Sequence, residues 1–349
     1  MLTIALTNRN KPYTTLQRCI RSLSVQGALV VLVDYGSDEH GLEAVQKIQS
    51  EFPEITIHYC PTQARLWNKS RALNIILKQC DTPYFFVGDV DMIFHPDFVE
   101  QALHLAKEDQ VMYFQAGFLS KEESQKEKEF KDYHIDFPST SHATGMTLYP
   151  THLLKALNGY DEFYHGWGSE DTDVHVRMKN AGVAVHFYDK EILMLHQWHP
   201  KHYRSVDSLE PFHSYQERVN QAYLKQATAT HRTLANANTA WGVVPKELPA
   251  TPSQEMTAAA TRNEIDALLA SIAQSSAAVV KLTVVPHSQR NDIKQTVKKM
   301  LGKKTPLFID MQEANDRILE WLIVNHREKD YSYVFDRKKD RIEVVLRLQ

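Results

Sequence analysis

The chain has 349 residues, a length typical of two domains, and its 40 basic and 43 acidic residues nearly balance at a net charge of −3, which gives no electrostatic reason to expect nucleic acid as a partner. The longest apolar run, residues 28–33, is far shorter than the ~20 residues that span a bilayer, and the first residues lack the pattern of a signal peptide. Three cysteines without metal-ligand spacing favour a reducing cytoplasm.

The first 115 residues alternate strand-like and helix-like segments. The expected strands are residues 2–6, 28–33, 55–59, 84–87 and 111–115. The expected helices contain Leu16 to Leu23 and residues 42–48, 72–77 and 98–105. This alternation predicts an α/β domain with a mostly parallel sheet. Because ligands bind at the carboxyl ends of such strands, we expect Asp34 and the segment 89–91 to face one crevice.

The rest of the chain predicts a second, smaller unit. Residues 121–132 are densely charged and fit a solvated helix or loop, residues 139–200 mix short strands with loops, and residues 214–240 look helical. Residues 246–262 have the composition of a linker. We therefore expect a domain over 1–245, with a nucleotide-binding half (1–120) and an acceptor and metal half (135–210), and a small α+β unit of unknown role over 263–349.

No glycine-rich phosphate loop occurs in the sequence, so a metal is the natural partner for any bound phosphates. Asp89 and Asp91 follow an apolar strand, and residues i and i+2 of an extended segment point the same way. Two carboxylates placed so suit a hard divalent cation that shares its shell with phosphate oxygens. A solvated acidic turn is the alternative for a D-x-D sequence.

The segment 165–178, HGWGSEDTDVHVRM, joins a large aromatic side chain to several acids. Gly166 and Gly168 flank Trp167 in a loop that can move, and Glu170 and Asp171 follow. An indole stacks on a sugar ring, and a carboxylate can accept a hydroxyl proton. The alternative is a helix N-terminus whose first-turn acids complement the helix dipole.

Two further segments offer metal and phosphate ligands. His196, His199 and His202 are three residues apart and could chelate one ion, although spacing alone does not decide which of them bind. Arg65, Lys69 and Arg71 surround Trp67 at an expected helix start, where cations could hold a pyrophosphate and the indole could stack on a base. An ordinary helix start with surface cations is equally consistent with this second pattern.

Taken together, the segments resemble metal-dependent glycosyltransferases of the GT-A fold that join a family-2-type nucleotide domain to a galactosyltransferase-type segment. β-1,4-Galactosyltransferases, bacterial chondroitin polymerases and polypeptide GalNAc-transferases are of this kind. The resemblance covers roughly residues 1–205. It rests on Thr7-Asn8-Arg9, the helix motif WNKSRALN at 67–74, Asp89-Val90-Asp91, Asn158-Gly159-Tyr160 with the GWGSEDTD motif at 166–173, and His196-x-x-His199.

The resemblance implies roles for single residues. Asp91 and His199 would ligate Mn²⁺ (or Mg²⁺), and His196 would take the place of a third ligand. Asp171 would be the catalytic base, with Glu170 binding the acceptor sugar. The residues expected at the donor, from the resemblance and the basic segment above, are Thr7, Arg9, Asp34, Arg65, Trp67, Lys69, Asp89 and Trp167.

The chain also departs from the family pattern. Ser169 replaces a glycine, which would stiffen the Trp167 loop, and Lys69 replaces an arginine and its fork geometry. The chain has neither the membrane anchor nor the stem of the secreted members, which favours a bacterial cytoplasmic enzyme acting at the inner face of the membrane or free of it. The C-terminal unit could dock a partner, dimerise or touch a membrane, although its apolar segments are most simply its core.

The resemblance implies sugar transfer from a UDP-sugar of Gal, GalNAc or Glc type to a glycan or lipid-linked glycan acceptor, with inversion, in the synthesis of a surface polysaccharide. Retention is the competing stereochemistry. Two other readings are a GT-A-like module that binds a glycan or nucleotide without catalysis, and a nucleotidyltransferase. The second lacks its usual glycine-rich basic signature near the N-terminus, where this chain has TNRNKPYTT.

Overall fold

The computed structural model describes residues 1–61, 64–200, 211, 214–290 and 292–349. These residues form two compact units. The first takes the described residues of 1–61, 67–201 and 217–244, and the second takes those of 62–66, 202–216 and 245–349. Among the described residues, no helix has the length and apolar content needed to cross a membrane.

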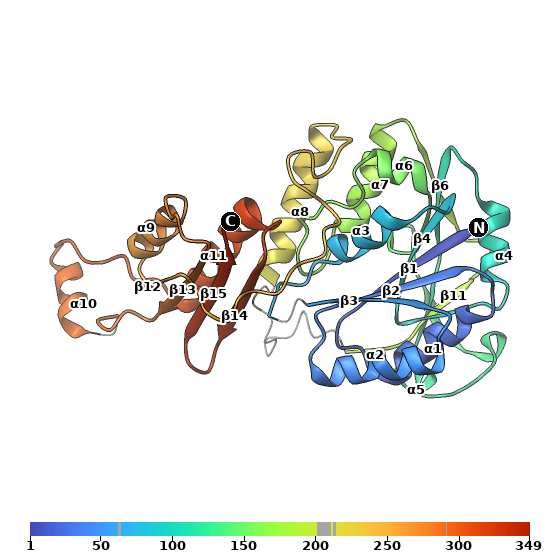
Figure 1. Cartoon of the computed structure of the whole chain (residues 1–349), viewed down its shortest axis with the longest axis horizontal. Coiled ribbons are helices and arrows are strands. Elements are labelled where there is room, and N and C mark those ends of the chain that lie inside the picture. The colour runs from blue at the N-terminus through green and yellow to red at the C-terminus, as the bar shows by residue number, and fades with distance from the viewer. Residues whose placement is uncertain (62–63, 201–210, 212–213, 291) are drawn as a thin grey trace. The chain divides into compact units, whose positions relative to one another are not determined.

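The first unit is built on a seven-stranded sheet with the order β10-β6-β9-β4-β1-β2-β3 (Figure 1). Its strands are β1 (Leu2–Asn8), β2 (Leu29–Tyr35), β3 (Thr56–Cys60), β4 (Tyr84–Asp89), β6 (Gln110–Phe114), β9 (Thr147–Pro150) and β10 (Ala184–Tyr188). All neighbours pair in parallel except β9, which is antiparallel to β4 and β6. The predicted α/β class and mostly parallel sheet are confirmed.

Helices cover both faces of this sheet, as its apolar strands require. Figure 1 shows α1 (Tyr13–Ser24) and α2 (Glu39–Glu51) on one face and α3 (Lys69–Gln79), α6 (Thr151–Ala156) and α7 (Glu170–Asn180) on the other. Alternate residues of β1 pack into the apolar cores on the two faces of the sheet. Ile4 and Leu6 pack with α1 and α2, and Ala5 packs with α3. The sheet is thereby fixed on both sides, and its carboxyl edge is a rigid base for polar side chains.

A second, four-stranded sheet of the first unit lies beside this edge, in the order β5-β11-β7-β8. It comprises β5 (Met92–Phe94), β11 (Met194–His196), β7 (Gly117–Leu119) and β8 (Ile135–Pro138). The remaining helices of the unit are α4 (Phe98–Leu105), α5 (Lys121–Ser124), the 3-10 turn η1 (Phe130–Asp132) and α8 (Ser214–Ala229), whose first residues fall in the second unit. Because β5 pairs with β11, His196 lies opposite Met92, next to Asp91.

The second unit has its own four-stranded sheet, in the order β12-β13-β15-β14. Its elements are β12 (Gln254–Ala259), α9 (Arg262–Ile272), β13 (Val279–Val285), α10 (Ile293–Met300), α11 (Met311–His326), β14 (Tyr331–Asp336) and β15 (Arg341–Arg347). β12 and β13 are parallel, and the other pairs are antiparallel. Buried side chains of α9 and α11, such as Leu268 and Leu322, supply its apolar interior.

Some expected segments differ from the structure. Residues 254–259, inside the expected linker, form strand β12, because a run of small and polar residues can pair with an apolar neighbour such as β13. The helix expected over 214–240 ends at Ala229, two residues before His231, which has a positive φ of 50°. The charged segment 121–132 contains only the short α5 and η1.

Candidate active site

The carboxyl edge of the main sheet gathers several of the predicted residues. β1 lies between β2 and β4, with Thr7 opposite Asp89 and Asn8 opposite Asp34. Asp34 and Asp89, which were expected to face one crevice, thus follow or end strands on the same edge of the sheet. Arg9 follows β1 directly and is half-buried.

Asp34 is a buried residue of β2 at this edge. Its side chain is 1% exposed, and one carboxylate oxygen accepts hydrogen bonds from Asn8 Nδ2 at 2.7 Å and Ser37 Oγ at 2.6 Å. These bonds tie the end of β1 to the turn after β2. Trp67 stands edge-on to Tyr35, the last residue of β2, with ring centroids 5.9 Å apart.

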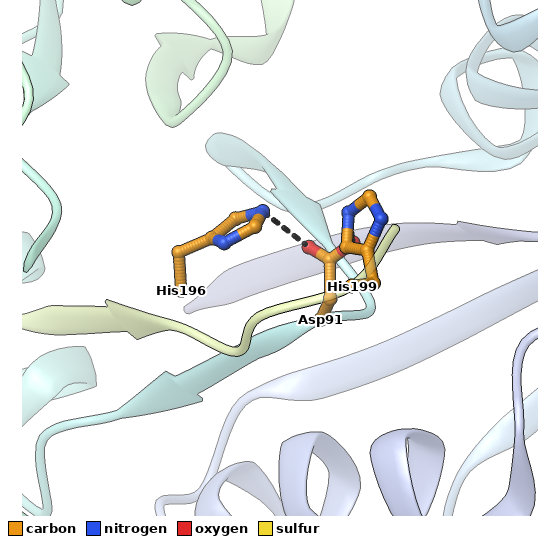
Figure 2. Close-up of side chains that lie close together, drawn as sticks. All are labelled: Asp91, His196 and His199. Carbon is orange, nitrogen blue, oxygen red and sulfur yellow. Dashed lines mark ion pairs between the residues drawn. The ribbon is translucent and has the colours of Figure 1, made fainter. Parts of the chain in front are cut away.

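Asp91, His196 and His199 form a cluster whose ligand atoms all lie within 4.8 Å of one another (Figure 2). Nε2 of His199 is 3.2 Å from Oδ2 of Asp91, and Nε2 of His196 is 3.7 Å from Oδ1. The third predicted histidine, His202, lies outside the described residues. The structure thus brings together the three residues that were singled out as metal ligands.

Lys11, which was not predicted, completes this cluster. Its Nζ is 2.6 Å from Oδ2 of Asp91. Burial by itself raises the pKa of Asp91, but the hydrogen bond with His199 and the charges of Lys11 and His196 outweigh burial and hold that pKa well below its usual range. Lys11 lies two positions after Arg9, just past the end of β1. This position of a basic residue at the carboxyl edge of the sheet could have identified it as a site residue.

The cluster fits a divalent metal ion. Asp91 is 5% exposed, and its Oδ1 has no hydrogen-bond partner within the described part of the chain, so a buried ligand oxygen is left to be satisfied. Two imidazoles and one carboxylate are ligands that first-row divalent ions accept, and Mn²⁺ is the ion among them that also favours oxygen donors such as phosphate.

A second cluster joins β4 to α7 through Lys69, the first residue of α3. Its Nζ lies 3.1 Å from both Oδ1 of Asp89 and Oδ2 of Asp171. Burial opposes the charge, yet Asp171 and Asp89 raise the pKa of Lys69 well above its usual value, so the ammonium stays charged. A Cβ on Gly145 would come within 3.3 Å of Oδ2 of Asp171, so a side chain there would crowd this carboxylate.

The two acids that begin α7 have unusual protonation. Burial and the charge of Asp171 raise the pKa of Glu170 to about 7. Burial also raises the pKa of Asp171, against the effect of Lys69. Oδ1 of Asp171 has no hydrogen-bond partner among the described residues. A partly desolvated carboxylate with one uncommitted oxygen is suited to accept a proton from a bound hydroxyl.

Trp167 precedes α7 in a loop of left-handed residues. Gly166, Gly168 and Ser169 have φ values of 74°, 94° and 78°, a region that disfavours side chains. The indole is 45% exposed. Nδ2 of Asn220, from α8, lies within hydrogen-bond distance of the carbonyl oxygens of His165, Trp167 and Gly168, at 2.9, 3.2 and 3.2 Å. No local sequence pattern could have predicted these hydrogen bonds of Asn220, because they join segments about fifty residues apart.

Three charged residues in or near the motifs form contacts that hold the fold together. Arg65 belongs to the second unit, where its guanidinium donates to the carbonyl oxygens of Arg327 and Lys329 and lies 4.0 Å from the ring centroid of Tyr331. The contacts described for it are thus with residues of its own unit. Arg71 and Asp173 are equally buried: Arg71 donates to the carbonyl of Val243, and Asp173 accepts from Arg177 at 2.6 Å.

Comparisons with known proteins identify the class. Residues 3–156 match the model of glycosyl transferase family 2, and residues 125–201 match the model described as the N-terminal domain of galactosyltransferase. Mouse chondroitin sulfate synthase 3 is 25% identical over 177 residues, which are 46% of this chain and 19% of that protein. The match thus spans about a fifth of the relative's length.

Solved structures resemble the chain more distantly. GalNAc-T7 with UDP, GalNAc and Mn²⁺ aligns with a TM-score of 0.47 and 12% identity, over 65% of this chain and 48% of that one. Residues 1–349 of S. aureus TarS in complex with UDP-GlcNAc align with a TM-score of 0.44 and 16% identity, over 68% of this chain and 74% of that one.

Proposed function

This chain is a glycosyltransferase with a family 2 domain joined to a galactosyltransferase-type segment, and we propose that it transfers a sugar of Gal, GalNAc or Glc type from a UDP-sugar to a glycan hydroxyl. The observation that carries this proposal is the presence of two charged clusters on one sheet edge. Asp91, His196 and His199 form the first, and Lys69 links Asp89 to Asp171 in the second.

In this proposal Asp91, His196 and His199 hold Mn²⁺ or Mg²⁺. When bound, the ion neutralises the diphosphate of the donor and stabilises the departing UDP as a Lewis acid. Lys11 forms an ion pair with Asp91 and balances the charge of this carboxylate. Two imidazole ligands favour Mn²⁺ over Mg²⁺, because Mg²⁺ takes almost only oxygen ligands.

The donor nucleotide is proposed to lie over the carboxyl ends of β1, β2 and β4. Trp67, held edge-on to Tyr35, offers a face for the uracil. The exposed indole of Trp167 lies next to the acids of α7, where it could cover the diphosphate or the transferred sugar. Thr7, Arg9 and Asp34 are kept as proposed donor contacts on the strength of their place at this edge.

Asp171 is the proposed base. It takes the proton of the acceptor hydroxyl while that oxygen forms the bond to the anomeric carbon and the bond from that carbon to UDP breaks. Lys69 donates to Oδ2 of the carboxylate, and the buried Oδ1, which has no hydrogen-bond partner among the described residues, is the oxygen proposed to take the proton. Glu170, one residue earlier, is proposed to bind another hydroxyl of the acceptor sugar.

We propose inversion at the anomeric carbon, because a base that activates the acceptor directly gives a single displacement. NMR of the product formed in the first minutes distinguishes the two outcomes. A β-linked product from an α-linked UDP-sugar agrees with the proposal, and an α-linked product replaces it with retention.

The biological setting is proposed from the state of the cysteines. The three cysteines, Cys19, Cys60 and Cys80, are free and buried, which fits a reducing compartment such as a bacterial cytoplasm. A growing surface polysaccharide, free or lipid-linked, would be the acceptor there. An oligosaccharide acceptor screen with the purified protein tests this part separately.

The direct test is UDP release from UDP-Gal, UDP-GalNAc and UDP-Glc, with Mn²⁺, with Mg²⁺ and with EDTA. We expect release with at least one donor, Mn²⁺ to exceed Mg²⁺, and EDTA to abolish it. Asp91→Ala should remove the dependence on metal together with the activity, whereas Asp97→Asn, an acid with a 63% exposed side chain after β5, should retain both. Equal turnover with EDTA would refute the metal role.

A further inference from the structure

Helix α10 of the second unit carries an exposed apolar face that its own fold does not use. Ile293, Val297 and Met300 are spaced i, i+4 and i+7 and are 79%, 47% and 83% exposed. Figure 1 shows α10 set apart from the sheet of its unit, on the connection between β13 and α11. Side chains of this kind are normally buried, so the face needs an occupant.

The apolar surface continues past the helix. Leu301 and Leu307 are 65% and 57% exposed and follow in the irregular segment that leads to α11. The exposed surface thus extends over a helix and a loop, without the single regular face that a protein groove would recognise. A lipid interface accepts such a surface because it demands no fixed shape.

The charged residues of the segment 293–309 are all lysines. Residues 293–309 contain Lys294, Lys298, Lys299, Lys303 and Lys304 and no acidic residue, although the whole chain carries a net charge of −3. Apart from Lys299, whose side chain falls outside the description, these lysines are exposed. Asp292 and Asp310 flank this segment, and within it lysines are the only charged residues. Exposed apolar side chains interspersed with lysines match the polar and apolar layers of a membrane surface that carries anionic headgroups.

We propose that α10 and the segment after it dock the protein on an anionic lipid surface. The apolar side chains enter the boundary between headgroups and acyl chains, and the lysines contact the anionic headgroups. An eight-residue helix with five exposed apolar side chains in its vicinity gives reversible attachment, so the lysines decide which membranes are bound. The proposal does not depend on the sugar-transfer chemistry proposed above.

The experiment is co-sedimentation of the full chain with vesicles of phosphatidylcholine alone and of phosphatidylcholine with a quarter phosphatidylglycerol. We expect binding to the anionic vesicles that weakens at high salt, and little binding to the neutral ones. Near an anionic surface each lysine changes partitioning roughly fivefold. Lys294→Glu/Lys298→Glu should therefore lower binding to anionic vesicles at least about tenfold, and Ile293→Glu/Met300→Glu should abolish it.

The control is Val25→Glu, which places one glutamate on an 86% exposed apolar residue of the first unit and should bind as the unmodified chain does. Unchanged thermal midpoints establish that the α10 variants are folded. Vesicle binding that survives Ile293→Glu/Met300→Glu overturns the proposal. So does a concentration-dependent dimer, seen by light scattering, that this variant abolishes while vesicles are not bound, since the face would then be a protein interface.

Discussion

At the scale of single residues, the neighbouring acids of α7 differ in their partners. Asp171 is paired with Lys69 and keeps one oxygen without a hydrogen bond in the described structure. Glu170 has its pKa raised to about 7 by burial and by the charge of Asp171. Burial raises the pKa of both groups, and of the two only Asp171 has a direct ion pair with Lys69 that opposes this effect.

Asp171→Asn should lower turnover by about 10²-fold or more, because an amide cannot take the proton of the acceptor. The change keeps the size of the side chain and still offers an oxygen to Lys69. UDP release under saturating donor and acceptor measures it. Donor binding, followed as the thermal shift caused by UDP with Mn²⁺, should remain, and near-normal turnover would remove Asp171 from the role of base.

Glu170→Gln should change how stability depends on pH. A carboxyl with a raised folded-state pKa contributes stability that is full below its unfolded pKa of about 4.3 and is lost as the pH rises through about 7. Glutamine stays neutral throughout. The variant should therefore gain about 1–3 kcal/mol over the unmodified chain between pH 5 and pH 8. Urea unfolding at both pH values measures this gain, and an equal difference at both would contradict the raised pKa.

At the scale of elements, the Trp167 loop is held from two sides. The N–H of Gly166 donates to the carbonyl of Trp67 at 3.0 Å, and Asn220 of α8, 1% exposed, holds three carbonyls of the same loop. Below the loop, Asn68 and Asn74 of the WNKSRALN motif donate to the carbonyls of Glu162 and Tyr160. The motifs thus fix α3, the loop and α7 to one another.

Asn220→Ala should release the Trp167 loop without touching any proposed ligand. Losing a buried amide that serves three acceptors should cost about 1–3 kcal/mol of stability and raise the KM for the donor more than it lowers kcat. Tryptophan quenching by acrylamide and donor kinetics measure the two effects. Gln221→Ala, at the exposed next position of α8, is the control. Identical quenching in both variants would show that the hydrogen bonds of Asn220 do not hold the indole.

Local sequence patterns predict much of this architecture, and the features that they do not predict have physical causes. The ends of the strands can be predicted because an apolar run stops at a polar residue. Asp34, Asp89 and Asp91 could therefore be assigned to the carboxyl edge of the main sheet from the sequence. The burial of Asp173 could not be predicted from its position two residues after Asp171, because it depends on the helix turning that side chain inward to Arg177. The contacts of Arg65 could not be predicted from local pattern, since its carbonyl partners come from residues more than 260 positions later.

At the scale of the whole molecule, the two units have separate apolar interiors. The two cores of the first unit draw their buried residues from Leu2 to Met194. The second unit buries Ile265, Leu322 and Leu346 on its own sheet and helices. The residues proposed as metal ligands and as base belong to the first unit, whereas α10 belongs to the second. Donor binding and the proposed lipid contact are therefore properties of different units.

Calorimetry should then resolve two unfolding transitions, since separate cores need not unfold together. UDP with Mn²⁺ at 100 times the dissociation constant adds about 2.7 kcal/mol to the state that binds it and should raise one transition only. Leu322→Ala removes a fully buried side chain of α11 and should lower the other by about 2–5 kcal/mol. Asp91→Ala should cancel the ligand shift and leave the Leu322-sensitive transition in place. One transition that responds to both the ligand and Leu322→Ala would mean that the units unfold as a single cooperative structure, and donor binding would then also stabilise the segment that carries α10.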